Sequence, residues 1–338
     1  MVQFILGEAG TGKTEYIYSL LRQSVKSGRR AILLVPEQFS FEAEKAVYQR
    51  LGAVLALQVE VLSFTRLANL VFRQCGGLAG RPLDDCARVL LMSLTLGELQ
   101  DSLTVYTRHA GNPSFVSSMV EMIGEFKNAG VPPEGMEELC GRLPHGTLRE
   151  KLKELSSIYS VYQSFIDRSY VDQKDDLMRA CARLEDKETP VFQEYDIFCD
   201  SFKGFMAGEF RLLDRLLRQG TNLTFSFTAD GLHDGEEGTG VFSPVKQTVR
   251  RLTRMAQEAE QAVRSPVLLK DFYRFQQSPE LSHMAAYLFH HPEEYTGRRS
   301  EDNLLLVQAP NPHEELAEVA GRVCALAREG GGRYREIA

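Results

Sequence analysis

The chain has 338 residues, a length that suggests about two domains at roughly 150 residues each. Hydrophobic residues make up 43% of it and charged residues 25%, which excludes the disordered and fibrous classes and indicates a globular protein with a buried core. The net charge of −7 argues against a strongly basic nucleic-acid-binding module, although a basic groove can lie on an acidic protein.

The sequence also argues against a membrane or exported protein. It has no apolar run close to the roughly 18–20 residues that a membrane helix needs. Residues 1–7 carry no charged leader, so we expect no signal peptide, no membrane partner and a cytoplasmic location. The six cysteines are scattered and form no CxxC pair. Free thiols in a reducing compartment are therefore expected, and a zinc or iron–sulfur site within this chain is not.

Strands and helices alternate at the start of the chain. Apolar runs predict strands at 2–6, 31–35 and 58–62, and helical patterns predict helices at 13–26 and 41–51. The second of these runs is apolar throughout, as in a strand that is buried on both faces of a parallel sheet. This βαβαβ order predicts right-handed crossovers and a parallel sheet, and hence an α/β fold.

From residue 64 to residue 185 the pattern changes to helical spacing, without a convincing strand. Leu152, Leu155 and Tyr159, for example, recur every three or four residues, as on one face of a helix. A helical segment of this length between strands predicts a large all-helical insertion rather than another βα repeat.

The α/β pattern then resumes. Strands are predicted at 195–199 and 222–228, helices at 207–218 and 244–260, and a polar, glycine-rich loop at 234–240. The polar residues that follow, up to residue 300, give no clear pattern.

The last segment begins the same pattern once more. A strand is predicted at 304–309 and a helix at 313–328, and the final residues look like the start of another strand. We therefore expect a fragment of a longer protein, with a short frayed terminus as the alternative. The predicted parts are the first part of an α/β domain at 1–64, the helical insertion at 65–190, the second part of that domain at 191–300, and the beginning of a second domain at 301–338.

A glycine-rich turn joins the first predicted strand to the first helix. Its residues match the phosphate-loop pattern G-x-x-x-x-G-K-[ST] in full: Gly7, Glu8, Ala9, Gly10, Thr11, Gly12, Lys13 and Thr14. Glycines let backbone N–H groups approach phosphate oxygens, and the helix N-terminus adds partial positive charge. We expect this loop to bind ATP, with Lys13 as the catalytic lysine at the β- and γ-phosphates and Thr14 as a ligand of Mg²⁺. The alternative is a glycine turn that keeps the shape without binding.

Hydrolysis of the nucleotide needs two further groups, an aspartate for Mg²⁺ and a carboxylate that activates water. Asp200 ends the predicted strand at 195–199 and is the candidate Mg²⁺ ligand, with a strand-end cap as the alternative. Ser201 follows it, where motor ATPases of the helicase type place glutamate, and Glu209 is expected on a helix surface. We therefore expect weak hydrolysis by this chain alone.

Several segments beyond the phosphate loop carry a family resemblance. They are Leu-Val-Pro-Glu-Gln-Phe-Ser at 34–40, Val-Leu-Ser-Phe-Thr-Arg-Leu-Ala at 61–68, Tyr-Val-Asp-Gln-Lys-Asp-Asp-Leu at 170–177 and Asp-Ser-Phe-Lys-Gly-Phe at 200–205. In this order they resemble the N-terminal region of the AddB/RexB family, the B subunits of bacterial ATP-dependent helicase/deoxyribonucleases. The resemblance spans the whole chain.

The resemblance implies a UvrD-like helicase fold, in which a RecA-like P-loop NTPase domain is interrupted by the helical insertion and a second RecA-like domain follows. It implies an AddA-type helicase/nuclease partner and a role in processing double-strand breaks for homologous recombination. The family's nuclease domain and the cysteines of its iron–sulfur cluster lie towards the C-terminus, so the six cysteines here are not assigned to that cluster.

Helicases of this fold hold single-stranded DNA with loops that follow the sheet strands, through phosphate contacts and base stacking. By this resemblance, the candidate DNA-binding residues are Gln38 and Phe39 after the second strand and Ser63, Phe64, Thr65 and Arg66 after the third. The alternative is that Ser63 or Thr65 caps a helix while Phe64 lies in the core.

Two other functions stay open. A stand-alone P-loop enzyme or a complete helicase would need a catalytic carboxylate beside Asp200, and Ser201 argues against it. A non-catalytic scaffold with a vestigial loop would have no nucleotide affinity, and the intact pair of Lys13 and Thr14 argues against that.

Overall fold

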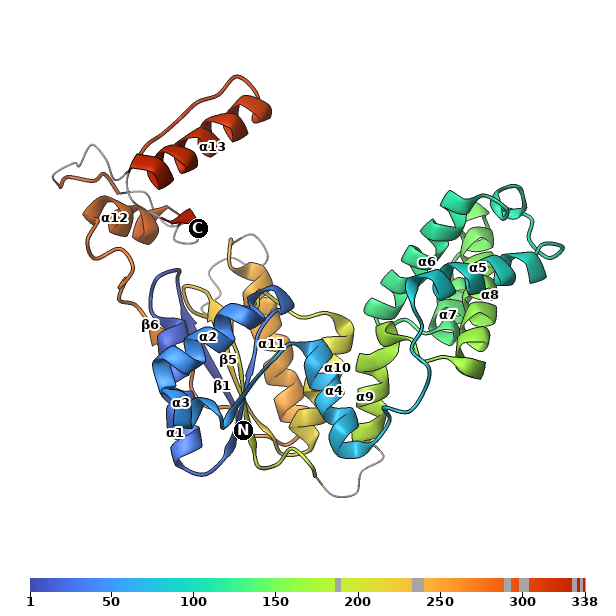
Figure 1. The fold of residues 1–338 in the computed structure, drawn as a ribbon, viewed down its shortest axis with the longest axis horizontal. Helices are drawn as coiled ribbons and strands as arrows, with labels where there is room; N and C mark the ends of the chain where they lie inside the picture. Colours follow the sequence, from blue (N-terminus) through green and yellow to red (C-terminus); the bar gives the residue numbers. More distant parts are fainter. Residues whose placement is uncertain are drawn as a thin grey trace. The chain divides into compact units, whose positions relative to one another are not determined.

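The chain forms two compact units, residues 1–271 and residues 272–338 (Figure 1). The computed structural model describes residues 1–185, 190–232, 240–288, 293–297, 304–329, 333–334 and 337. The domain boundaries at 64, 190 and 300 stay predictions.

Six strands of the first unit form one sheet in the order β3-β2-β4-β5-β1-β6. They are β1 (Val2–Gly7), β2 (Arg30–Leu34), β3 (Val59–Leu62), β4 (Tyr195–Cys199), β5 (Asn222–Thr228) and β6 (Val267–Leu269). Every pairing is parallel, as expected when helices connect successive strands. The structure thus confirms an α/β fold with a parallel sheet.

Helices cover both faces of this sheet. They are α1 (Lys13–Lys26) and α2 (Ser40–Leu51) on one face and α4 (Phe64–Cys75), α10 (Ala207–Arg218) and α11 (Ser243–Glu258) on the other. Alternate residues of a strand point to opposite faces, so Phe4 and Leu6 join the core under α10 while Ile5 joins the core under α1. Both sets are apolar because both faces are covered.

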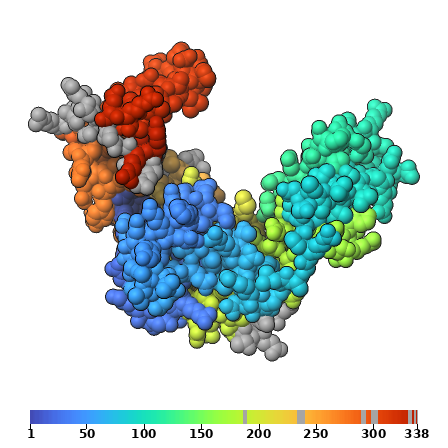
Figure 2. Space-filling model, in the orientation of Figure 1, coloured from blue at the N-terminus to red at the C-terminus, as the bar shows by residue number. Residues whose placement is uncertain are grey.

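Four helices of the insertion enclose a separate hydrophobic core. They are α5 (Asp85–Glu98), α6 (Pro113–Asn128), α7 (Pro133–Arg142) and α8 (Thr147–Ser169), with a short 3-10 helix, η2 (Thr107–His109), before α6. Met92, Ile123 and Tyr162 are buried in this core. Figure 2 shows these helices, from teal to green, as one continuous body.

We call the six-stranded sheet and the helices that cover it the sheet unit. The chain leaves this unit for the insertion, and returns to it, at one place. Val171 accepts a backbone hydrogen bond from Leu83 at 3.0 Å and donates one to Arg81 at 2.8 Å. After this crossing come η3 (Gln173–Asp175) and α9 (Asp176–Glu185). Helix α9 packs against α4 and α10, so both α4 and α9 belong to the core of the sheet unit.

The sequence predictions fail in two places. Residues 304–309 form no strand, because an apolar run becomes a strand only beside a hydrogen-bonding neighbour, and the described part of residues 272–338 contains no strand. The short elements that were not predicted include α3 (Ala53–Ala56), β6 and α12 (Pro279–Tyr287). The predicted helix at 313–328 is present as α13 (Pro312–Glu329). The predicted loop at 234–240 lies almost wholly outside the described residues.

Helix length and hydropathy also bear on membrane association. In the part of the chain that the structure describes, no helix is both long and apolar enough to span a bilayer.

Candidate functional site

The phosphate-loop residues lie between β1 and α1, as predicted. Gly10 and Gly12 have φ values of 85° and 82°, in the left-handed region that glycine adopts without strain. Gly7 ends β1 where the chain is tightly packed: a Cβ there would lie 2.8 Å from the carbonyl oxygen of Leu269 and would overlap the Thr11 hydroxyl. Glycine is therefore required at these three positions by the backbone itself.

The Lys13 side chain folds back over the loop. Its Nζ donates to the carbonyl oxygens of Gly7 at 2.9 Å and Glu8 at 2.8 Å, and the Thr11 hydroxyl donates to the same Glu8 carbonyl at 2.8 Å. The ammonium group thus lies directly above the turn, at the N-terminus of α1. Such a cradle of backbone N–H groups, helix dipole and ammonium is suited to an anion such as phosphate.

Asp200 lies next to this loop, although it is far from it in sequence. It follows β4, and β5 separates β4 from β1 in the sheet. The Thr14 hydroxyl donates to Asp200 Oδ2 at 2.9 Å across that gap. Asp200 as a whole is buried, with 5% of its surface exposed. The structure therefore brings together Lys13, Thr14 and Asp200, and a hydroxyl beside a carboxylate is an oxygen set that Mg²⁺ favours.

Ser226 is a site residue that sequence reasoning missed. Ser226, on β5, is 3% exposed, and its hydroxyl donates a hydrogen bond to Asp200 Oδ1. The signal that could have found it was its polarity, because Thr224 and Ser226 alternate with Phe225 and Phe227 in an otherwise apolar, central strand. Their importance became visible only once β5 was known to lie between β1 and β4.

Ser201 stands beside Asp200 in an unusual conformation. Its φ of 66° makes it one of two non-glycine residues in the left-handed region among those described, the other being Glu260. Its hydroxyl lies 3.4 Å from Asp200 Oδ2. Glu209 accepts from the backbone N–H of Met206 at 2.7 Å, and burial raises the pKa of its carboxyl. It is a partly buried helix cap rather than a surface residue.

The segment after β3 adopts the arrangement given above as its alternative. Ser63 caps α4 by accepting from the backbone N–H of Arg66 at 3.4 Å. Phe64 is 6% exposed and packs edge-on against Phe202 and Phe205. Thr65 and Arg66 are exposed. DNA contact by this segment stays a prediction, with Thr65 and Arg66 carrying its accessible side chains.

Arg66 pairs with Glu44 of α2 at 2.8 Å, which places the segment after β3 beside the segment after β2. There Gln38 and Phe39, in the 3-10 helix η1 (Glu37–Phe39), are both exposed. Both segments follow parallel, neighbouring strands and so lie at the carboxyl edge of the sheet, where open α/β sheets bind their ligands.

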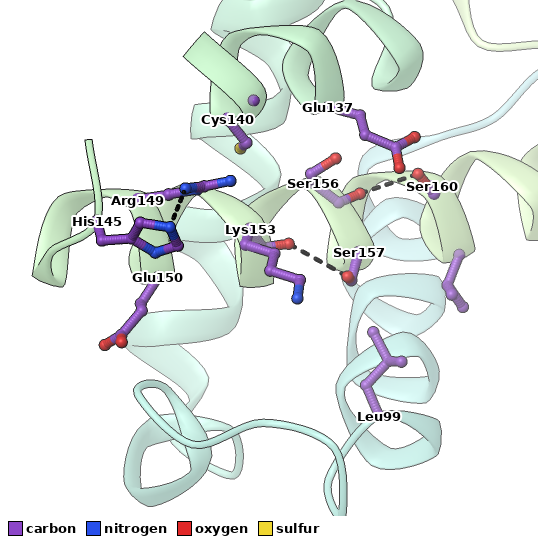
Figure 3. A pocket seen from close by; sticks show the side chains of 12 residues that line it. Leu99, Glu137, Cys140, His145, Arg149, Glu150, Lys153, Ser156, Ser157 and Ser160 are labelled. Carbon is purple, nitrogen blue, oxygen red and sulfur yellow. Dashed lines mark hydrogen bonds between the residues drawn. The ribbon is translucent and has the colours of Figure 1, made fainter. Parts of the chain in front are cut away.

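A separate cavity of about 830 Å³ lies in the helical insertion, between α7 and α8 (Figure 3). Its lining mixes the bases Arg149 and Lys153 with the acids Glu137 and Glu150. His145 and Arg149 interact at 3.1 Å at the N-terminal end of α8. None of the residues predicted from the sequence lines this cavity.

In the described part of the chain, no group of three or more His, Cys, Asp or Glu side chains could hold a metal ion. Among the described residues no cysteine forms a disulfide bond, and Cys140, Cys181 and Cys199 are buried.

Known proteins match the chain over its full length. It is 33% identical to the B subunit of the ATP-dependent helicase/deoxyribonuclease of Acetivibrio thermocellus, with 100% of the chain and 30% of the relative covered. It is 31% identical to the B subunits of the same name from Thermoanaerobacter pseudethanolicus and Clostridium tetani, with 99% and 100% of the chain covered and 29% and 30% of the relatives. The chain thus spans about 30% of the length of the curated relatives that it matches.

A family model agrees with these relatives. The model described as "ADDB, N-terminal" matches residues 4–285, which include the sheet, the phosphate loop, the helical insertion and Asp200. The chain therefore belongs to the family of AddB N-terminal regions.

Proposed function

We propose that this chain is the nucleotide-binding, helicase-like part of the B subunit of an ATP-dependent helicase/deoxyribonuclease that processes DNA double-strand breaks for homologous recombination. The single observation that carries the proposal is the 2.9 Å hydrogen bond between Thr14 and Asp200 beside the phosphate loop. It unites two side chains that a RecA-like P-loop NTPase uses for Mg²⁺, although they are separated by most of the chain.

The residues of the site have distinct roles in this proposal. Backbone N–H groups of the loop and of the first turn of α1 bind phosphate oxygens of ATP. Lys13 exchanges the carbonyl oxygens of Gly7 and Glu8 for the β- and γ-phosphates. Thr14 and Asp200 would hold Mg²⁺, with Ser226 orienting the Asp200 carboxylate. When bound, Mg²⁺ offsets the negative charge of the phosphate oxygens.

Hydrolysis by this chain is proposed to be weak. Motor ATPases of the helicase type place the glutamate that activates water directly after the metal-binding aspartate, and here that position holds Ser201. The Glu209 carboxylate is engaged in capping α10. The site therefore suits nucleotide binding better than motor activity.

DNA and a partner subunit complete the proposal. The names of the relatives describe enzymes that act on DNA and consist of subunits. We place single-stranded DNA along the carboxyl edge, at Gln38, Phe39, Thr65 and Arg66. We propose the broken DNA duplex as the substrate and an AddA-type subunit as the partner, both in the cytoplasm. The iron–sulfur cluster of the family is expected in its C-terminal part.

Calorimetric titration of the chain with ATP and Mg²⁺ tests the proposal. Lys13→Ala should weaken binding about tenfold or more, because it removes charge-assisted hydrogen bonds to phosphate. Lys26→Ala, at the exposed end of the same helix, is the matched control and should change nothing. Equal affinities for wild type and Lys13→Ala, or no binding by either, would refute the nucleotide site.

Steady-state hydrolysis then separates a silent site from a motor. The proposal expects low turnover that single-stranded DNA leaves unchanged. Strong stimulation by DNA would show that Ser201 does not silence the site, and an active motor would replace this part of the proposal.

A further inference from the structure

The outer surface of α10 and α11 carries a cluster of arginines on an otherwise acidic chain. A cavity of about 340 Å³ between the two helices is lined by nine residues, five of them arginine. We call this the arginine groove, and its basic residues are Arg211, Arg215, Arg218, Arg251 and Arg254. Asp214 and Glu258 are its acids, so five positive charges and two negative ones line the groove, while the whole chain carries −7.

The groove follows from the sequence pattern of the two helices. Helix α10 reads Arg-Leu-Leu-Asp-Arg-Leu-Leu-Arg from residue 211, and its four leucines are fully buried against the sheet. The arginines, at helical spacing, therefore lie along the opposite, solvent-facing side. Helix α11 also has an apolar face and an arginine face: Leu252 and Ala256 are buried, and Arg251 and Arg254 are exposed. The two helices are neighbours in the fold (Figure 1).

Some of these guanidinium groups are held in place by contacts within the protein. Asp214 accepts from Arg218 at 2.9 Å and lies 3.9 Å from Arg215, which also pairs with Glu185. Arg251 stacks over the Phe210 ring, 3.8 Å from its centroid. Stacking uses the face of a guanidinium and leaves its N–H edges for a ligand.

The other side of α11 extends the positive surface. A second cavity of about 380 Å³ is lined by Lys246, Arg250 and Arg254 together with polar and apolar residues. Arg254 lines both cavities, so the two are adjacent on α11, and Lys246 in the second is paired with Asp230 at 3.0 Å. Within the described residues, Arg211, Arg251 and Arg254 form no ion pair with a carboxylate.

We infer that the arginine groove binds the sugar–phosphate backbone of a nucleic-acid strand. Guanidinium forks match the paired oxygens of a phosphate. Protein interfaces also use arginine, but they combine it with an apolar, aromatic centre that is depleted of other charges. Here Phe210 is 5% exposed and Met255 is partly buried against the core. The groove lies on helices that carry none of the proposed nucleotide or DNA contacts, so it would be an additional contact independent of the carboxyl edge.

Fluorescence anisotropy of a labelled single-stranded oligothymidylate of about 20 nucleotides, bound by the full chain, tests this inference. The variant is the triple substitution Arg211→Gln, Arg251→Gln and Arg254→Gln. The matched control is Arg142→Gln, Arg168→Gln and Arg328→Gln, which removes the same charge from exposed positions elsewhere. Circular dichroism verifies that both variants are folded.

The groove variant should weaken binding about tenfold or more. It should also reduce the slope of log affinity against log salt by about 2, because three phosphate contacts are lost at about 0.7 each for a single strand. The control variant should bind within about threefold of wild type. Similar losses in both variants, an unchanged groove variant, or no binding of DNA by wild type would each overturn the inference.

Two further measurements distinguish nucleic-acid binding by the arginine groove from binding of an acidic protein and from DNA binding at the carboxyl edge. Polyglutamate that displaces the oligonucleotide at equal charge concentration would favour an acidic protein segment and overturn the inference. ATP affinity of the groove variant should equal that of wild type. A Gln38→Ala and Arg66→Ala variant that loses DNA while the groove variant does not would leave the proposed function standing and refute the groove.

Discussion

Asp200 is the residue on which the geometry of the candidate site depends. The carboxylate of a residue that is 5% exposed must be compensated by hydrogen bonds or charge. The compensation comes from hydroxyl groups, those of Thr14, Ser201 and Ser226. Neutral donors fix the orientation of the carboxylate without neutralising its charge, which keeps it attractive to a cation.

Ser226→Ala tests how far the orientation of Asp200 matters. The change leaves one oxygen of a buried carboxylate without its donor, so the free energy of unfolding should fall by about 1–3 kcal/mol. The affinity for ATP in the presence of Mg²⁺ should fall, and the affinity without Mg²⁺ should stay the same. Urea denaturation and calorimetry measure the two effects.

Ser19→Ala is the control for this variant, because Ser19 is exposed on α1 and donates only to the Tyr16 carbonyl. It should change neither quantity. An Mg²⁺-dependent affinity that survives Ser226→Ala would show that Thr14 and Ser201 suffice to orient Asp200.

How much of the site the sequence could predict depends on where its residues lie along the chain. Lys13 and Thr14 belong to a contiguous motif, and Asp200 ends a recognisable apolar strand, so all three were predicted. Ser226 could not be, because its role depends on the position of β5 in the sheet. Phe64 shows the reverse case: its place after a strand suggested base stacking, while its contacts with Phe202 and Phe205 required the fold.

At the scale of elements, a buried ionic cluster joins α5 and α6 to η3 in the insertion. Asp172, 3% exposed, accepts from Arg88 at 2.8 Å and from Lys127 at 2.9 Å, and Lys127 also contacts Asp175 at 2.6 Å. Burial by itself raises the pKa of Asp172, but the positive charges of Lys127 and Arg88 outweigh it, so the pKa lies below its ordinary value. For Asp175, burial outweighs Lys127 and the pKa is raised.

Asp172→Asn should lower the free energy of unfolding by about 3–5 kcal/mol at neutral pH, because it removes the buried carboxylate that Arg88 and Lys127 share. A carboxyl whose pKa is lowered on folding stabilises the protein above its unfolded pKa of about 4 and loses this contribution as pH falls through the folded pKa. The difference in the free energy of unfolding between the variant and the wild type should therefore become smaller below about pH 4.

Chemical denaturation across this pH range measures the effect. Asp175→Asn is the matched control from the same cluster. Because folding raises the pKa of Asp175, the ionised form of that carboxyl is disfavoured in the native state, and its pH dependence should have the opposite sign. If Asp172→Asn lowers the free energy of unfolding by the same amount at all pH values, the pKa of Asp172 is not lowered by folding and the prediction is wrong.

Helices and strands with longer apolar patterns were predicted more accurately than short ones. Strand 195–199 and helix 207–218 were predicted with the boundaries that β4 and α10 have, because apolar residues repeat at the right period up to each end. Strand β6 has three residues, too few for any period to be visible. The apolar run at 304–309 was misread because periodicity does not reveal whether a neighbouring strand exists.

At the scale of the whole molecule, the chain begins and ends the insertion at neighbouring points of the sheet unit, next to Val171. The chain enters at Arg81 and Leu83 and leaves at Val171, with backbone hydrogen bonds between the two segments. The core of the insertion, around Met92 and Tyr162, shares no residue with the cores on either face of the sheet. Two such cores should fold separately.

Excision of residues 83–170 tests this separation. Pro82 and Val171 form a parallel β-bridge, so the two cut ends lie close together but run in the same direction. A flexible glycine linker long enough to turn the chain back on itself should reconnect them. The remaining unit should keep its parallel sheet and bind ATP within about threefold of the intact chain, because Lys13, Thr14 and Asp200 lie outside the excised segment. Circular dichroism and calorimetry measure both properties. A collapsed or aggregated product, alongside a well-folded intact chain, would show that the sheet requires the insertion and that the two cores form one cooperative unit.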